Sequence, residues 1–221
     1  MNYIMTVINP EALQKLVDIC TELAMPIPIA LHGRGTAVQS MRELLGIEST
    51  EKWIVFSVAS EEKTKEYMKR LRRTLYIGVP GHGIAWAVPI KSVGGGKTLA
   101  YLNDGRQDAR YTPDFNFSYE LIVAIANEGR TDAVMNAARA AGAMGGTVLH
   151  GRGTTSPESE KFFGVSIAKE KEVILIVARK EQKADIMRSI MTRAGTDTDA
   201  GAVVFSVPVS EVAGFGMFDE T

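Results

Sequence analysis

The sequence lacks the features that would link it by disulfides or anchor it in a membrane. Cys20 is the single cysteine among 221 residues, so no disulfide can form within the chain. No apolar run reaches the roughly 20 residues that span a bilayer, and the first residues lack the basic and apolar regions of a signal peptide. We therefore expect a cytoplasmic protein with no membrane partner.

An excess of charge of one sign is also missing. The chain has 25 Lys and Arg residues against 26 Asp and Glu residues, which gives a net charge of -1. Such a balance provides no general electrostatic attraction to the phosphates of nucleic acid. Nucleic acid is therefore not an expected partner.

The common catalytic signatures are absent from the sequence. It contains no Gly-x-Ser-x-Gly elbow, Walker loop, Cys-x-x-Cys pair or dinucleotide fingerprint. Each of these motifs places a nucleophile, a phosphate cradle or a redox pair at a fixed spacing. Their absence favours a protein that is not an enzyme.

What the chain does contain is an internal repeat. Leu-His-Gly-Arg-Gly-Thr occurs at 31–36 and again at 149–154. The register continues without a gap from 44–47 to 162–165, and with a one-residue shift from 86–89 to 205–208. Matches in the same order over so much of the chain indicate a duplicated fold unit.

Hydrophobic periodicity predicts strand, helix, strand, strand, helix, strand in each half. The order βαββαβ is that of a ferredoxin-like unit, so we predict an α+β fold of two tandem ferredoxin-like units with antiparallel sheets. The expected strands lie at 3–8, 27–31, 53–59 and 84–90, then at 119–126, 147–149, 172–178 and 202–209. The expected helices follow Asn9-Pro10 and Ser60 in the first half and cover 131–141 and 180–193 in the second.

The same pattern predicts the domain boundaries. The first unit is expected at 1–93 and the second at 118–221. Between them, residues 94–117 are rich in Gly, Asp, Asn and Arg, which is typical of an exposed linker.

Two short motifs resemble the PII signal-transduction proteins (nitrogen regulatory protein P-II). That family has a nucleotide-binding turn Gly-Asp-Gly-Lys-Ile-Phe-Val-x-Pro-Val, and this chain has the similar Gly81-His82-Gly83-Ile84-Ala85-Trp86-Ala87-Val88-Pro89-Ile90, with a looser second copy at 200–209. The family also has Gly-x-Gly-Arg at the end of its second strand, where Gly33-Arg34-Gly35 and Gly151-Arg152-Gly153 stand here. The chain thus resembles a tandem-duplicated PII-like protein.

This resemblance implies a regulator. PII-like proteins sense small molecules, typically adenine nucleotides, between neighbouring units and signal to a target protein through a loop. It implies a homo-oligomer without a cofactor, with an adenine nucleotide or another small anion as effector, an unidentified target protein and a role in nitrogen regulation. Ile84 and His82 replace the lysine and aspartate of the family turn, which favours a changed ligand over a full ATP site.

The repeated segment has the chemistry of an anion site. Backbone N–H groups beside glycine, a guanidinium and a hydroxyl together suit a phosphate or a carboxylate. The candidate effector-binding residues are His32, Gly33, Arg34, Gly35, Thr36, Gly81, His82 and Gly83 in the first repeat, and His150, Gly151, Arg152, Gly153, Thr154 and Gly201 in the second.

Other interpretations of these residues stay open. The glycines would shape a turn even without a ligand, with Arg34 and Arg152 paired to nearby acids. The histidines have no further metal ligand at a suitable spacing, so no metal is expected. The alternative function is a structural or protein-interaction module without a small ligand, and a hydrolase using His32 or His150 is the third hypothesis.

Overall fold

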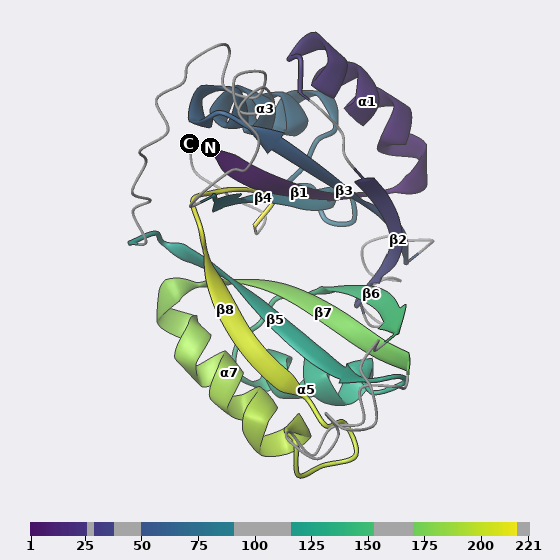
Figure 1. Ribbon diagram of the computed structural model, residues 1–221, viewed down its shortest axis with the longest axis vertical. Helices are drawn as coiled ribbons and strands as arrows, with labels where there is room; N and C mark the ends of the chain where they lie inside the picture. Colours follow the sequence, from purple (N-terminus) through teal and green to yellow (C-terminus); the bar gives the residue numbers. More distant parts are fainter. Residues whose placement is uncertain (26–28, 38–49, 91–115, 153–169, 216–221) are drawn as a thin grey trace. The chain divides into compact units, whose positions relative to one another are not determined.

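The computed structural model describes residues 1–25, 29–37, 50–90, 116–152 and 170–215 (Figure 1). Contacts between residues divide the chain into two compact units. The first unit consists of 1–32, 51–119 and 208–221, and the second of 33–50 and 120–207. Within the described ranges, no helix is long and apolar enough to cross a membrane.

The first unit has the predicted βαββαβ order. Its strands lie side by side in the order β2-β3-β1-β4-β9, and β1 pairs antiparallel with both β3 and β4. Its elements are β1 (Asn2–Ile8), the 3-10 turn η1 (Pro10–Ala12), α1 (Leu13–Glu22), β2 (Ile29–Gly35), β3 (Glu51–Ala59), α3 (Glu61–Thr74), β4 (Gly83–Pro89) and β9 (Glu211–Ala213). The boundary between the units falls inside β2, after His32.

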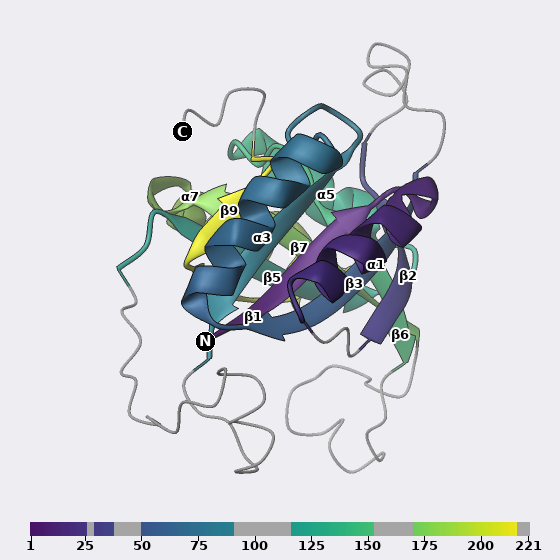
Figure 2. The same cartoon turned by 90° about the horizontal axis from the view of Figure 1, so that it is seen from above.

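Both helices of the first unit cover one face of its sheet (Figures 1 and 2). Their apolar side chains recur every three or four residues, so each helix presents one continuous buried face. That face holds Leu16, Ile19 and Cys20 on α1 and Tyr67, Met68 and Leu71 on α3. They pack with Ile4, Ile8, Val55 and Ala59 of the sheet into one core.

The second unit repeats this arrangement. Its strands follow the order β8-β5-β7-β6, and helices α5 and α7 lie on one face of them (Figure 1). Its elements are β5 (Tyr119–Asn127), α5 (Thr131–Ala140), β6 (Thr147–Arg152), β7 (Glu170–Arg179), α7 (Lys180–Ala194) and β8 (Val203–Val209). Its core is rich in alanine, with Ile122, Met135, Ile174, Ile186 and Ile190 as larger members.

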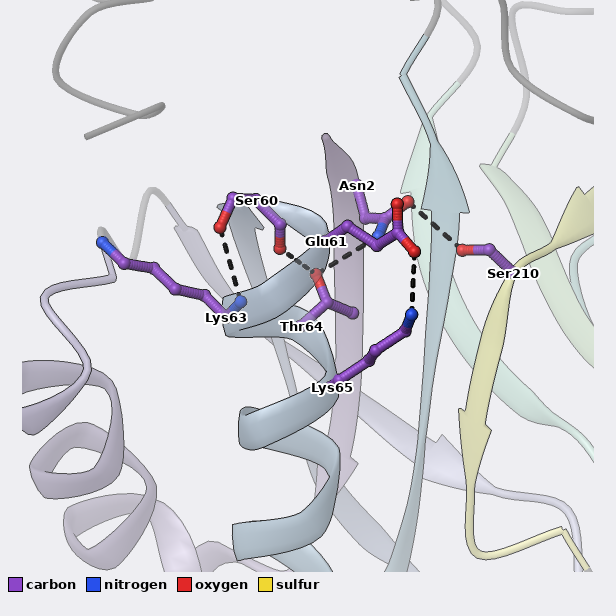
Figure 3. Close-up of polar contacts among 7 residues, drawn as sticks. All are labelled: Asn2, Ser60, Glu61, Lys63, Thr64, Lys65 and Ser210. Carbon is purple, nitrogen blue, oxygen red and sulfur yellow. Dashed lines mark hydrogen bonds and ion pairs between the residues drawn. The ribbon is translucent and has the colours of Figure 1, made fainter. Parts of the chain in front are cut away.

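A short C-terminal tail, which we define as residues 210–215, completes the first unit. Its strand β9 pairs with β4, Ala213 is fully buried in the first core, and the Arg72 guanidinium donates to the carbonyl of Val212 at 2.8 Å. Ser210 Oγ donates to Asn2 Oδ1 at 3.2 Å, while Asn2 Nδ2 donates to Thr64 Oγ1 at 3.2 Å (Figure 3). The tail is thus fixed to the first strand and, through it, to α3.

The predicted fold class and the order of elements are confirmed in both units. Ser60 caps α3 as expected, since its Oγ accepts from the backbone N–H of Lys63 at 3.4 Å (Figure 3). Asn9 stands at the N-cap of η1 and Pro10 follows it, but the Asn9 side chain makes no capping bond. It accepts from the Lys52 ammonium instead.

The boundaries 1–93, 94–117 and 118–221 stay a prediction. The expected linker lies outside the described residues except for 116–117. The compact units group 33–50 with the second half and 208–221 with the first.

Candidate functional site

The first copy of the repeated segment is part of a strand. β2 runs through His32 to Gly35, so these glycines lie in a strand and not in the turn of the alternative interpretation. Arg34 and Gly35 pair with Val148 and Thr147 of β6, and the Gly35 N–H donates to the Thr50 carbonyl at 2.7 Å. The backbone of Gly35 is therefore occupied by neighbouring chain segments rather than open to an anion.

The Arg34 guanidinium forms an ion pair with Glu172 on β7. Its Nη2 lies 3.1 Å from Glu172 Oε1. The Arg34 side chain is 47% exposed, whereas that of Glu172 is 1% exposed. One of the two open interpretations, in which an arginine of the repeat pairs with an acid, thus describes Arg34 in this structure.

Glu172 also caps helix α5. Its Oε2 accepts from the backbone N–H of Thr131 at 2.8 Å, from Thr131 Oγ1 at 2.7 Å and from the Arg130 N–H at 3.1 Å. A carboxylate there satisfies N–H groups that the helix leaves unpaired and faces its positive dipole end. Burial alone raises the pKa of Glu172, but the hydrogen bonds from Thr131 and Gly129 and the charge of Arg34 outweigh burial, so the pKa lies below its ordinary value.

Thr36 forms several hydrogen bonds within the second unit. Its N–H and Oγ1 both bond to the carbonyl of Gly146, at 3.1 and 3.0 Å, and its Oγ1 also lies 2.9 Å from the Gly146 N–H. The Arg139 guanidinium donates to the Thr36 carbonyl. The Thr36 hydroxyl, which was expected to bind an anion, therefore bonds to the backbone of Gly146.

The predicted histidines have separate surroundings. The His32 ring lies over Trp53 of β3, with 3.7 Å between ring centroids. His82 Nδ1 lies 3.3 Å from the Leu75 carbonyl, and its ring meets Tyr76 edge to face. No group of three or more His, Cys, Asp or Glu residues that could hold a metal occurs among the residues described.

The second copy of the segment lies at the end of β6. His150, Gly151 and Arg152 pair with Glu172, Lys171 and Glu170 of β7. His150 and Gly151 are exposed, and a Cβ on Gly151 would meet no atom within 4 Å. Gly153 and Thr154 lie outside the described residues.

The glycine turn before β4 has the conformation that glycine favours. Gly81 and Gly83 have φ angles of 88° and 136°. A Cβ on Gly83 would lie 2.1 Å from the Val7 carbonyl oxygen, so no other residue fits there without a backbone shift. In the second unit, Gly201 has a φ of 56° and its Cβ position lies 3.0 Å from Asn127 Nδ2.

A buried lysine supports each of these turns. Lys52 is 8% exposed, and its ammonium donates to Asn9 Oδ1 and to the Gly81 carbonyl, the latter at 3.0 Å. Burial lowers the pKa of Lys52, while the charge of Glu11 opposes that shift. Lys171 is 7% exposed and donates to Asn127 Oδ1 at 2.6 Å. Asn127 Nδ2 in turn donates to the Asp199 carbonyl at 3.0 Å, beside the turn with Gly201.

Sequence reasoning missed these lysine–asparagine pairs. The signal was present in the repeat, because Asn9 stands opposite Asn127 without a gap, and Lys52 opposite Lys171 after the one-residue shift. Glu172 had no such signal, since its counterpart in the first repeat is Trp53.

Comparison with known families identifies part of the chain. Residues 119–215, from the start of β5 to beyond β9, match the family model of nitrogen regulatory protein P-II. We refer to the matched residues as the P-II domain. Glu172, Lys171, Arg152 and the turn with Gly201 all belong to this P-II domain, and so does the tail that packs on the first unit.

Solved structures similar to parts of the chain include a PII protein and a protein of unknown function. One is a crystal structure of Arabidopsis thaliana PII bound to citrate, with 26% sequence identity. The match covers 45% of this chain and 81% of the Arabidopsis chain, with a TM-score of 0.35. The other is a functionally unknown protein from Pediococcus pentosaceus, with 12% sequence identity. The match covers 42% of this chain and 94% of the Pediococcus chain, with a TM-score of 0.30. No curated protein matches the chain.

Proposed function

We propose that the protein is a PII-like regulator that binds a small anionic effector and signals to a partner protein, without catalysing a reaction. The observation that carries this proposal is the P-II match over 119–215. As further parts of it, we propose a homo-oligomer in the cytoplasm, an unidentified target protein and a role in nitrogen regulation.

The buried lysines support an anionic effector beside the glycine turns. An ammonium removed from water is costly unless other groups compensate its charge. Lys52 donates to two neutral oxygen atoms, those of Asn9 and Gly81, so an anion near the turn would gain a strong attraction. Lys171 likewise donates to the equivalent asparagine, Asn127. We therefore place the effector next to these lysines, with nucleotide-like phosphates or a small carboxylic acid as its chemical class.

A thermal-shift series tests this proposal. The wild-type protein would be heated with ATP, ADP, AMP, cyclic nucleotides, 2-oxoglutarate, citrate and bicarbonate, each alone at millimolar concentration. A ligand that binds the native state raises the melting temperature as its concentration exceeds its Kd. We expect at least one of these anions to raise it, and Lys171→Met to remove that shift.

Lys69→Met is the matched control, because Lys69 is an exposed residue of α3. It removes the same charge and should leave the ligand-induced shift unchanged. A shift that survives in Lys171→Met would contradict the placement of the anion at this turn. The absence of any shift in the wild type would contradict the sensor function.

The second candidate function is a protein-interaction module. The contacts of Arg34 and Thr36 favour it, because this copy of the segment binds protein groups in the structure. It predicts no thermal shift with any of the anions, and assembly that is unchanged by Lys171→Met in light scattering.

A further inference from the structure

A cavity of about 320 Å³ lies beside the C-terminal tail, where the tail meets α3. All of its described lining residues belong to the first compact unit, and none of them belongs to the glycine turns or the buried lysines. A pocket of this volume suits a small molecule. Its polar and aromatic lining residues include Arg72, Phe117, Ser118, Tyr119, Ser210 and Glu211.

The half-buried side chain of Glu211 lies on the face of the sheet that α3 covers. On β9, Glu211 pairs with Ala87 of β4, and Ala87 is buried in the first core. Side chains paired across antiparallel strands point to the same face. The charges of Lys65 and Arg72, both on α3, accordingly act on the Glu211 carboxylate. The tail thus brings an acid next to basic side chains of α3.

Both of these basic side chains are bonded to other groups. The Lys65 ammonium forms an ion pair with Glu61 at 2.8 Å (Figure 3), and the Arg72 guanidinium donates through Nη2 to the Val212 carbonyl at 2.8 Å. Burial raises the pKa of Glu211 above its ordinary value, and the opposing charges of Lys65 and Arg72 do not cancel that shift. Further hydrogen-bond donors would therefore stabilise the charged form of this carboxylate.

The mixture of charges in the cavity favours a ligand that carries none. Because Glu211 and Arg72 line the cavity together, an ion of either sign would meet a side chain of its own sign there. A hydroxyl group meets no such repulsion, since it can donate to a carboxylate and accept from a guanidinium N–H. The rings of Phe117 and Tyr119 offer apolar surface to the C–H groups of such a ligand.

We propose that this cavity binds a small neutral molecule rich in hydroxyl groups, of the sugar or polyol class, with Glu211 accepting and Arg72 donating hydrogen bonds. This site is separate from that of the proposed anionic effector, and neither depends on the other. A ligand that contacts both Arg72 and the tail stabilises the attachment of the tail to α3, because it binds the state in which the two lie together.

An NMR titration of the isotope-labelled full chain tests this proposal. The probes are D-glucose, D-mannitol and myo-inositol, each added alone up to millimolar concentrations. We expect at least one of them to shift the backbone amide signals of Ser118, Ser210 and Glu211 in a saturable way, because saturation distinguishes binding from the general effect of a cosolute. Glu211→Ala removes the hydrogen-bond acceptor and should weaken the binding of that probe by about tenfold or more.

Glu181→Ala is the matched control, because Glu181 is an exposed acid at the start of α7 in the second unit. It should leave the affinity for the same probe unchanged. If Glu211→Ala loses the dispersed amide spectrum of a folded protein, Glu211→Gln replaces it. This variant keeps the shape of the side chain without its charge and should weaken binding by about threefold or more.

Three results would overturn the proposal. The first is the absence of a saturable shift at these amides with all three probes, and the second is an unchanged affinity in the folded Glu211 variant. The third is a shift at these amides with glycine or citrate but with none of the three probes, which would assign the cavity to a zwitterion or an anion. The thermal-shift series with anions decides the effector separately, so the two proposals can fail independently.

Discussion

The two repeats build the same fold around cores of different chemistry. In the first, Thr6 Oγ1 and the Tyr67 hydroxyl lie 2.8 Å apart, both 1% exposed, and Cys20 also bonds to Tyr67. The equivalent positions of the second repeat are Ala124, Ile186 and Ala138, all fully buried. A polar trio in one unit thus occupies the place of an apolar trio in the other.

This difference shows which part of the core the fold requires. Buried polar groups cost free energy unless they bond to one another, and the polar trio meets that condition internally. An apolar trio meets it by having no polar atoms. The βαββαβ order needs only that the space be filled, so these positions are free to vary together but not one at a time.

The largest expected effect tests whether the two cores are equally essential. Leu71 and Ile190 are equivalent residues on α3 and α7, and both are fully buried. Leu71→Ala and Ile190→Ala should each lower the free energy of unfolding by about 2–5 kcal/mol, from lost burial and the cavity left behind. Urea denaturation measures this, and a loss below about 1 kcal/mol in either variant would show that one core is loosely packed.

The next effect concerns the tail, which belongs to the first unit. Gly214 has a φ of 83°, and a Cβ there would lie 2.7 Å from the Gly83 carbonyl oxygen. Gly214→Ala should cost about 2–3 kcal/mol through backbone strain and this collision. Hydrogen exchange should become faster in β4 and unchanged in β7.

Gly145→Ala is the control for the tail, because its φ is not in the left-handed region and its Cβ would meet nothing within 4 Å. It should leave exchange in both strands as in the wild type. Equal acceleration of β4 and β7 by Gly214→Ala would mean that the tail supports the whole chain rather than the first unit.

A smaller effect is expected inside the polar trio. Tyr67→Phe removes the partner of the buried Thr6 hydroxyl, which should cost about 1–2 kcal/mol. Adding Thr6→Val should recover part of this loss, because both partners are then apolar. Thermal denaturation of the single and double variants checks this, and a double variant no more stable than Tyr67→Phe would contradict it.

The smallest effect is a dependence on pH. Burial raises the pKa of the Cys20 thiol from its ordinary value of 9.0 to about 11, even though the hydrogen bond with Tyr67 opposes the shift. The unfolded chain then loses this proton at a lower pH than the folded chain. The contribution of the thiol to the free energy of unfolding is therefore fully present below pH 9.0 and is lost as the pH rises toward about 11. Between pH 8 and pH 10 we expect the loss to reach about 1 kcal/mol.

Cys20→Ala copies the residue of the second repeat and should remove this part of the pH dependence. Urea titrations at pH 8 and at pH 10 measure the difference. A variant whose stability still falls as steeply as that of the wild type would assign the dependence to other groups, among them Tyr67, whose pKa burial also raises.

The sequence was sufficient for the fold because its signals are local and repeated. Strands, helices and their order follow from periodicity, from Asn9-Pro10 and from the cap at Ser60. The pairing of β9 with β4 was not foreseen. Three residues are too short to give a hydrophobic period, and their partner strand lies far away in the sequence.

The candidate site was predicted less completely. The segment with Arg34 was identified from its repetition, but its contacts with Glu172 and Gly146 depend on residues distant in sequence. Glu172 has no equivalent acidic residue in the first repeat, so aligning the two repeats could not predict that contact. The buried lysines carried a readable signal in the repeat, although a lysine at the start of a strand looks like an ordinary solvated residue until its burial is known.

The attachment of the tail to β4 affects how the protein can form during synthesis. A ribosome makes residues 1–90 first, but Ala213 of the first core is translated only after nearly all of the second repeat. Domains often fold in the order in which they are made. Here the edge of β4 in the first unit stays unpaired until β9 has been synthesised, after the second repeat. The repeat that is made first is therefore the one that is finished last.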